Sequence, residues 1–159
     1  TICLVGSEMC IRDSYGSLSN YGKPDRGIID KVISNALKGK EIFVWGSGEY
    51  YRDYIFIEDV IDAFFIAFKE ISATNGKHYE IGTSVPVKII DAFKLIISLV
   101  NNLGTYPKLV IKENIKFDSL MDQRSFVAND KFCKETSWKP KISLKEGLTK
   151  IITNSNEQR

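Results

Sequence analysis

The sequence of 159 residues contains few of the residues on which several classes of function depend. It has one histidine and three cysteines, and Cys3 and Cys10 both stand near its start, so neither a disulfide framework nor a metal site is expected. Its 22 basic and 20 acidic residues leave a formal net charge of +2, which predicts neither nucleic acid nor a membrane surface as a partner. The longest apolar stretches, residues 60–68 and 89–100, are too short to span a bilayer. We therefore expect one globular domain with a modest core and a cytoplasmic location.

The beginning of the chain differs in character from the rest. Residues 4–13 read Leu-Val-Gly-Ser-Glu-Met-Cys-Ile-Arg-Asp, which is similar to a transposase adapter used in library preparation, translated in one frame. We predict that residues 1–14 are a sequencing or assembly artefact and not part of the fold. The protein segment proper is then 15–153, followed by a disordered tail at 154–159.

The remaining sequence is organised around residues 42–69. An apolar strand is predicted at 42–45 and another at 54–57, because both runs are short and rich in β-branched and aromatic residues. The turn Gly46-Ser47-Gly48 follows the first strand, but no third glycine completes a dinucleotide-binding fingerprint at a helix start. Glu58 and Asp59 suit the start of a helix, since carboxylates satisfy its free N–H groups.

Arg52 stands on the predicted loop between these two strands. A guanidinium beside a glycine turn is suited to grip a phosphate by paired N–H bonds. It is equally suited to pair with a surface carboxylate, and spacing alone leaves both interpretations open.

Other segments follow from hydrophobic periodicity and from the position of glycines. His78 has no carboxylate or nucleophile at a spacing typical of catalysis and is predicted to be a surface residue. Trp138 is predicted to anchor the core. Short strands are expected at 78–82 and 109–111, and helices at 28–37, 58–70, 88–103, 131–136 and 143–152.

Residues 44–60 read Val-Trp-Gly-Ser-Gly-Glu-Tyr-Tyr-Arg-Asp-Tyr-Ile-Phe-Ile-Glu-Asp-Val. This run resembles the signature of the extended short-chain dehydrogenase/reductases, the nucleotide-sugar epimerases and dehydratases, in which Tyr/Trp-Gly-x-Gly leads to Arg-Asp-Tyr/Phe-Ile-x-Val-x-Asp. The similarity continues at 79–83 and 138–148 and lies within the carboxyl-terminal half of that family. It implies an α/β fold: the substrate-binding lobe with the last strands and helices of a Rossmann-type sheet, truncated at the amino terminus.

The resemblance also implies a reaction. The parent protein is expected to be an NAD-dependent nucleotide-sugar epimerase or dehydratase, most similar to a UDP-sugar 4-epimerase, and a homodimer. The family's Tyr-x-x-x-Lys pair and its glycine-rich NAD turn are both absent from this sequence. We therefore expect no catalytic residue here and an inactive fragment. The alternatives are a non-catalytic binding or scaffold member of the same fold, and a nucleotide-sugar dehydratase or decarboxylase.

What remains is expected to recognise a nucleoside-diphosphate sugar. Asp-Gln-Arg-Ser-Phe-Val-Ala-Asn at 122–129 resembles the family's Gly-Asp-x-Arg-x-x-x-Ala-Asp element, whose basic residue approaches the diphosphate in some members; an exposed ion pair is the alternative for that arginine. The substrate-binding residues implied by the resemblance are Arg52, Val44, Trp45, Gly46, Arg124, Asp122 and Ile28.

The predicted helix at 58–70 independently indicates that part of the parent protein is missing. The segment at 58–70 is apolar nearly all round, and such a helix is buried on more than one side. A chain of this size offers little to cover it, so we expect the amino-terminal half of the parent to do so.

Overall fold

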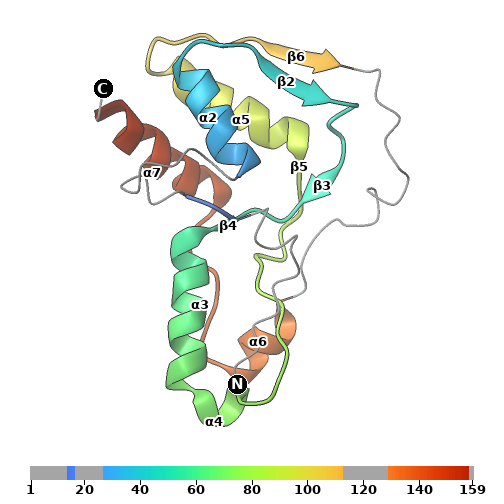
Figure 1. The fold of residues 1–159 in the computed structure, drawn as a ribbon, viewed down its shortest axis with the longest axis vertical. Helices are drawn as coiled ribbons and strands as arrows, with labels where there is room; N and C mark the ends of the chain where they lie inside the picture. The colour runs from blue at the N-terminus through green and yellow to red at the C-terminus, as the bar shows by residue number, and fades with distance from the viewer. Residues whose placement is uncertain (1–13, 17–26, 113–128, 158–159) are drawn as a thin grey trace.

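The structure is a computed structural model that describes residues 14–16, 27–112 and 129–157. Helices and short strands are interspersed along these ranges, so the predicted α/β class is confirmed. Figure 1 shows the helices in two groups, which lie on either side of β4 (Ile55–Phe56). One group comprises α2 (Ile28–Leu37), α5 (Ile89–Asn101) and α7 (Leu144–Glu157), and the other comprises α3 (Ile57–Lys69), α4 (Ile71–Thr74) and α6 (Asp130–Glu135).

The strands pair two by two. The predicted strand at 42–45 is β2 (Ile42–Trp45), which pairs in parallel with β6 (Leu109–Lys112). The strands β3 (Tyr51–Arg52) and β5 (Val87–Lys88) form an antiparallel pair, and β1 (Ser14–Tyr15) runs parallel to β4.

Two strand predictions need correction. Arg52 lies in β3 and not in a loop, because a two-residue strand leaves no periodicity for the sequence to show. The strand predicted at 78–82 does not form, and the structure has only an isolated bridge at His78, which is exposed as predicted.

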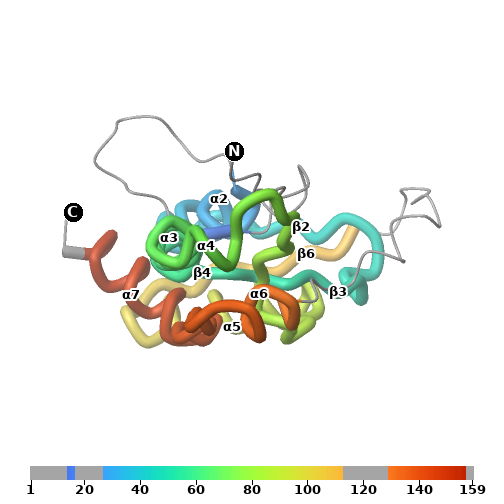
Figure 2. Tube along the Cα trace, turned by 90° about the horizontal axis from the view of Figure 1, so that it is seen from below, coloured from blue at the N-terminus to red at the C-terminus, as the bar shows by residue number. Residues whose placement is uncertain are grey.

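The larger core lies between α2, α5, α7 and the strands. In Figure 2 the strands run between α2 and α3 on one side and α5 and α7 on the other, and α2 also packs directly on α5. The helix faces that the sequence predicts to be apolar are buried here, since α2 buries Val32 and Ile33 and α5 buries Phe93 and Ile96.

The second core joins α3 to α6 through aromatic side chains. Trp138 is 2% exposed and packs against Phe132, with ring centroids 5.5 Å apart, so its predicted role as a core anchor is confirmed. Its indole Nε1 donates to the carbonyl oxygen of Asp59 at 3.1 Å. The Asp59 carboxylate accepts from the backbone N–H groups of Lys141 at 3.1 Å and Ile142 at 3.0 Å.

The prediction that Glu58 and Asp59 open a helix is confirmed, but the prediction that their carboxylates satisfy its free N–H groups is wrong. Both lie in the first turn of α3, but no side chain caps that helix. Asp59 instead holds the segment that enters α7, and Glu58 pairs with Lys150 on α7 at 2.9 Å.

Both ends of the described chain bear on the predicted boundaries. Ser14, the last residue of the adapter-like segment, pairs with Ile55 in the β1–β4 ladder, while residues 1–13 lie outside the described ranges. At the other end α7 continues to Glu157, so the tail predicted from residue 154 is helical for most of its length. No helix within the described ranges is long and apolar enough to cross a membrane.

Gly147, on α7, sits against two rings. A Cβ at this position would lie 2.7 Å from Phe56 Cδ2 and closer still to the hydroxyl oxygen of Tyr15. An alanine normally stabilises a helix interior by about 1 kcal/mol relative to glycine. Here we expect Gly147→Ala to lower the free energy of unfolding by about 1–3 kcal/mol, because the added methyl overpacks the core.

Denaturant unfolding measures this effect, and Thr153→Ala on an exposed turn of the same helix is the control. The control is expected to stay within about 0.5 kcal/mol of the parent. An alanine at 147 that stabilises the protein would contradict the packing described above.

Candidate functional site

The turn after β2 is fixed by close packing. Gly46 and Gly48 have φ values of +74° and +71°, a conformation that glycine adopts without strain. A Cβ at Gly48 would lie 2.7 Å from Val44 Cγ1, so this residue must be small. The N–H of Ile90 donates to the Gly48 carbonyl oxygen at 2.9 Å, which ties the turn to the start of α5. The turn therefore sets where β3 begins.

Arg52 lies directly opposite Val87 in the β3–β5 pair. Residues directly opposite in an antiparallel pair place their side chains on the same face, with Cβ atoms about 4.5–5.5 Å apart. Val87 lines a cavity, so Arg52 lies on the same face as one of the lining residues, although it is not a lining residue itself. One guanidinium nitrogen, Nη1, donates to the Tyr51 carbonyl oxygen at 2.9 Å.

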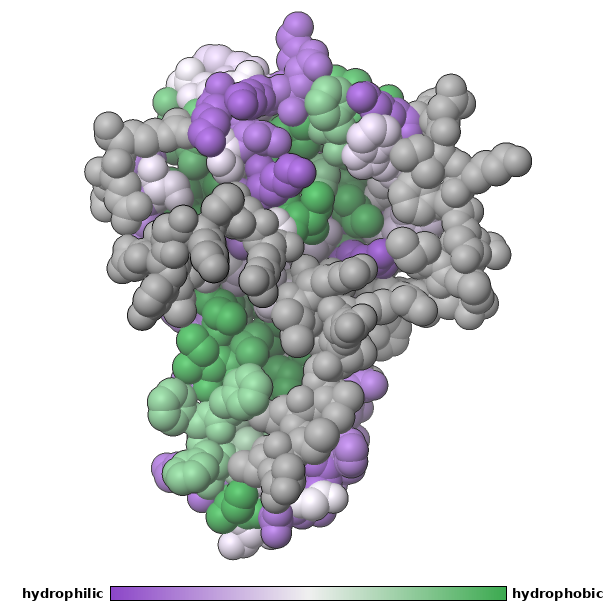
Figure 3. Space-filling model, viewed as in Figure 1, coloured by the Kyte–Doolittle hydropathy of each residue, from purple (hydrophilic) through white to green (hydrophobic). Residues whose placement is uncertain are grey.

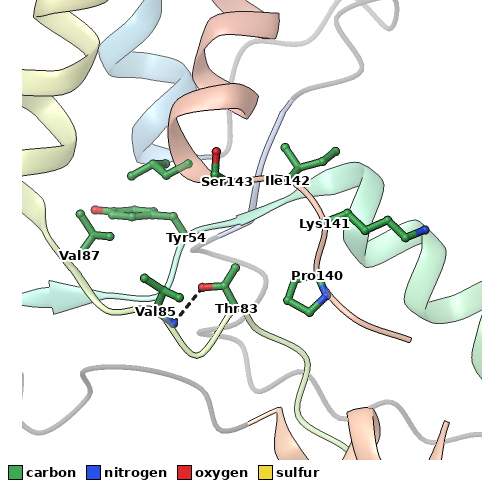
Figure 4. Close-up of a pocket in the computed structure, with 9 residues that line it drawn as sticks. Tyr54, Thr83, Val85, Val87, Pro140, Lys141, Ile142 and Ser143 are labelled. Carbon is green, nitrogen blue, oxygen red and sulfur yellow. Dashed lines mark hydrogen bonds between the residues drawn. The ribbon is translucent and has the colours of Figure 1, made fainter. Parts of the chain in front are cut away.

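The cavity has a volume of about 290 Å³ and a largely apolar lining. Figure 4 shows the Tyr54 ring and the Thr83 and Val87 side chains on one side of it, across from the segment that leads into α7. Three neighbouring elements thus form its walls: the chain after β3, the loop before β5, and the start of α7. The lining residues are Tyr54, Thr83, Val85, Val87, Pro140, Lys141, Ile142, Ser143 and Leu144.

An aromatic surface lies on the outer face of the β2–β6 pair. Alternation along β2 buries Ile42 and Val44 and exposes Phe43 and Trp45, whose exposed fraction is 50%. The ammonium of Lys112 lies 4.1 Å from the Phe43 ring centroid and 4.9 Å from that of Trp45, within the range of a cation–π contact. Trp45 thus presents an exposed indole one residue before the glycine turn.

The positive charge nearest to Arg52 on β5, that of Lys88, is paired with a carboxylate. Lys88 pairs with Glu49 at 2.5 Å. The hydrogen bond and charge of Lys88 lower the pKa of Glu49, and Glu49 in turn raises the pKa of Lys88. Both groups stay charged near neutral pH, so the Lys88 charge is already balanced locally.

The predicted site residues differ in how exposed they are. The first residue of α2, Ile28, is 49% exposed, and Trp45 and Arg52 are accessible too. Val44 is 2% exposed and its side chain belongs to the core, so only its main chain is available to a ligand. Asp122 and Arg124 lie outside the described residues. Within the described ranges no group of three metal-ligating side chains comes together.

Comparison with known proteins now adds to this geometry. The model of the NAD dependent epimerase/dehydratase family matches residues 11–82, which include β2, the glycine turn and Arg52 and begin inside the adapter-like segment. A dTDP-glucose 4,6-dehydratase of Shigella flexneri is 31% identical over 140 residues, covering 84% of this chain and 38% of the relative.

Solved structures agree. A UDP-glucose 4-epimerase of Thermotoga maritima, solved with UDP-glucose, superposes with a TM-score of 0.70 at 28% identity, covering 92% of this chain and 44% of its own. A dTDP-glucose 4,6-dehydratase of Bacillus anthracis in complex with NAD superposes with a TM-score of 0.68 at 24% identity and covers 91% of this chain and 43% of its own. The chain is similar to the NAD-dependent epimerase/dehydratase family.

These matches confirm the predicted fold class, a Rossmann-type epimerase/dehydratase fold. The chain spans about 38% of the length of the Shigella relative and 44% of the Thermotoga one. Most of the length of these epimerase/dehydratase proteins therefore has no counterpart here.

Sequence reasoning missed two buried polar residues next to the site, Asp53 and Asn129. They are 4% and 6% exposed, and both bind the loop before β5. Two signals mark Asp53 in the sequence: it is a charged residue inside the otherwise apolar and aromatic run after Arg52, and it is the aspartate of the Arg-Asp-Tyr signature. The partners of both residues are at least thirty positions away along the chain, so no local pattern shows them.

Proposed function

We propose that this chain carries the nucleotide-sugar-binding part of an NAD-dependent epimerase/dehydratase. The observation that supports this best is the position of Arg52, directly opposite Val87, which lines the cavity. A guanidinium binds a diphosphate by paired, charge-assisted N–H bonds. A largely apolar cavity beside it suits the less polar groups attached to that diphosphate.

The exposed indole of Trp45 supports the same proposal. Aromatic side chains stack on nucleobases irrespective of sequence, and Trp45 is separated from Arg52 only by the glycine turn and the start of β3. Trp45 is therefore proposed to contact the base, with the main chain of Val44 and Gly46 beside it and Ile28 at the start of α2. Arg124 and Asp122 remain predicted contacts.

The sequence contains no Gly-x-x-Gly-x-x-Gly turn and no Tyr-x-x-x-Lys pair. The residues present therefore do not form the cradle that NAD requires, and we assign none of them to the cofactor. NAD and the catalytic pair are proposed to belong to a part of the protein outside this sequence. This chain then contributes binding and orientation of the substrate, and no step of the chemistry is derived from it.

The uncovered side of α3 suggests where that other part lies. Asp59, Ala63 and Ala67 face the second core, whereas Phe64, Phe65 and Phe68 are 56%, 69% and 74% exposed. Figure 3 shows hydrophobic residues gathered on the lower part of the molecule, where α3 lies. We propose that this face is covered by the remaining part of the epimerase/dehydratase, as the sequence pattern also predicts.

An exposed apolar face of this size has a measurable consequence. The 159-residue chain is expected to bind a hydrophobic dye and to self-associate. The double variant Phe65→Gln/Phe68→Gln is expected to remove most of the dye signal at unchanged thermal stability, because neither ring packs in a core. Tyr106→Gln, at a lone aromatic that is 74% exposed, is the control and should change little. Equal signals from the double variant and the parent would contradict this role of α3.

Two reactions are candidates for the complete protein, 4-epimerisation and 4,6-dehydration of a nucleotide sugar. The sequence resemblance favours 4-epimerisation, while a relative of this chain is a 4,6-dehydratase. Incubating the complete protein with NAD and either UDP-glucose or dTDP-glucose distinguishes them by mass spectrometry. A dehydratase yields a product lighter by one water, and a 4-epimerase yields a sugar of unchanged mass with an altered proton spectrum. Binding without conversion of either sugar would indicate a non-catalytic member.

A further inference from the structure

A hydrogen-bonded network lies behind Arg52. Asp53 directly follows β3, and consecutive side chains along a strand point to opposite faces. Arg52 shares a face of the β3–β5 pair with Val87, while the side chain of Asp53 is buried and 4% exposed. Its carboxylate accepts from the backbone N–H groups of Thr83 and Ser84, both at 2.9 Å, and from the Thr83 hydroxyl. The loop before β5 thus holds the residue that directly follows Arg52.

This loop contains an unusual backbone conformation. Ser84 has a φ of +59° and is the one non-glycine residue with positive φ among the residues that the structure describes. Serine adopts this left-handed region rarely, and it persists where surrounding contacts determine it. The Ser84 N–H reaches Asp53 in this conformation.

Asn129 supplies contacts that hold Ser84 in this conformation. Its amide nitrogen Nδ2 donates to the Gly82 carbonyl oxygen at 2.6 Å, and its Oδ1 accepts from the Ser84 hydroxyl at 2.8 Å. The backbone N–H of Asn129 donates to the same hydroxyl oxygen at 3.3 Å. Asn129 is 6% exposed, precedes α6 and does not line the cavity. It can therefore influence a ligand there only through the loop.

We infer that Asn129 is a positioning residue for nucleotide binding. It holds Ser84 in the left-handed conformation, Ser84 and Thr83 hold Asp53, and Asp53 directs Arg52 toward the diphosphate. This inference rests on the proposed function. It assigns Asn129 a role in affinity although it is part of neither the cavity wall nor the aromatic surface.

Replacing Asn129 by alanine removes both amide contacts from the loop. In the 159-residue chain we expect Asn129→Ala to bind UDP about three- to tenfold more weakly by calorimetry, the range of one or two net hydrogen bonds. Amide hydrogen exchange at Thr83 and Ser84 is expected to accelerate in the same variant. Asn102→Ala, at an exposed position after α5, is the matched control and should change neither measurement.

A rescue separates positioning from general stability. Glycine adopts positive φ without strain, so Ser84→Gly no longer needs Asn129 to hold the conformation. The double variant Ser84→Gly/Asn129→Ala should therefore regain UDP affinity to within about threefold of the parent, even though it has lost more side-chain contacts. Unchanged affinity in Asn129→Ala, or a loss that Ser84→Gly does not restore, would overturn the inference.

Failure of the proposed function gives a different result. If the parent chain shows no affinity for UDP, nucleotide binding by this chain is wrong, and hydrogen exchange then decides the inference alone. Faster exchange at Thr83 and Ser84 in Asn129→Ala, reversed at Thr83 by Ser84→Gly, supports the positioning network. Unchanged exchange overturns it.

Discussion

Replacing Asp59 by alanine is expected to lower the free energy of unfolding by about 3 kcal/mol or more. The Asp59 carboxylate is 1% exposed and accepts from the N–H groups of Lys141 and Ile142. A hydrogen bond to a charged acceptor contributes about 1.5–3 kcal/mol, and a buried donor left without its partner adds a desolvation penalty. Its loss also releases the segment from Lys141 into α7, which forms one wall of the cavity.

Asp62 provides a matched control for this substitution. It lies three residues further along α3 and pairs with the side chain of the same Lys141 at 2.7 Å, but both side chains are largely exposed. An exposed ion pair contributes about 0–1 kcal/mol, so Asp62→Ala should have a small effect. Denaturant unfolding of both variants measures the difference. Equal losses in the two would show that Asp59 does not hold α7 in place.

The second large effect concerns ligand affinity. Arg52→Ala is expected to weaken binding of a nucleoside diphosphate by roughly ten- to a hundredfold, because a charge-assisted hydrogen bond contributes about 1.5–3 kcal/mol and each 1.4 kcal/mol is a factor of ten. Arg52→Lys should recover only part of this affinity, since an ammonium keeps the charge and loses the paired geometry. Calorimetric titration with UDP and with dTDP provides the measurement.

Lys88→Ala distinguishes the guanidinium from general positive charge. Lys88 neighbours Arg52 across the β3–β5 pair, but its charge is matched by Glu49. We expect its removal to change affinity by less than about threefold, as for a screened surface charge. If Arg52→Ala binds like the parent, or loses fold and ligand together, the arginine has a structural role only.

The parts of the fold that sequence predicts well are those with a local signal. The helices α2 and α5 follow from apolar side chains at helical spacing, and β2 follows from a short run of β-branched and aromatic residues. The two helices also end shortly before glycines, Gly39 after α2 and Gly104 after α5. Arg52, Trp45 and Gly46 are predicted site residues because of a signature of fixed spacing, which is local as well.

The parts that sequence does not predict depend on distant partners. Asp59 lies in the first turn of α3 as predicted, but its partners Lys141 and Ile142 lie more than eighty positions away and leave no local signal. The pair β3–β5 is two residues long on each side, so its register comes from the glycine turn and from α5 and not from periodicity. Asn129 contacts Gly82 and Ser84 across gaps of 47 and 45 positions in the sequence.

The claim that this chain binds a nucleotide sugar but performs none of the chemistry is tested most directly by ligand-observed NMR. The purified 159-residue chain is mixed with UDP-glucose, dTDP-glucose and NAD, and saturation transfer to each ligand is recorded while the sugar resonances are followed over time. We predict transfer to the nucleotide sugars, weakened by Arg52→Ala, with unchanged sugar spectra. Conversion of either sugar, or transfer to NAD alone, would contradict the assignment of this chain to substrate recognition.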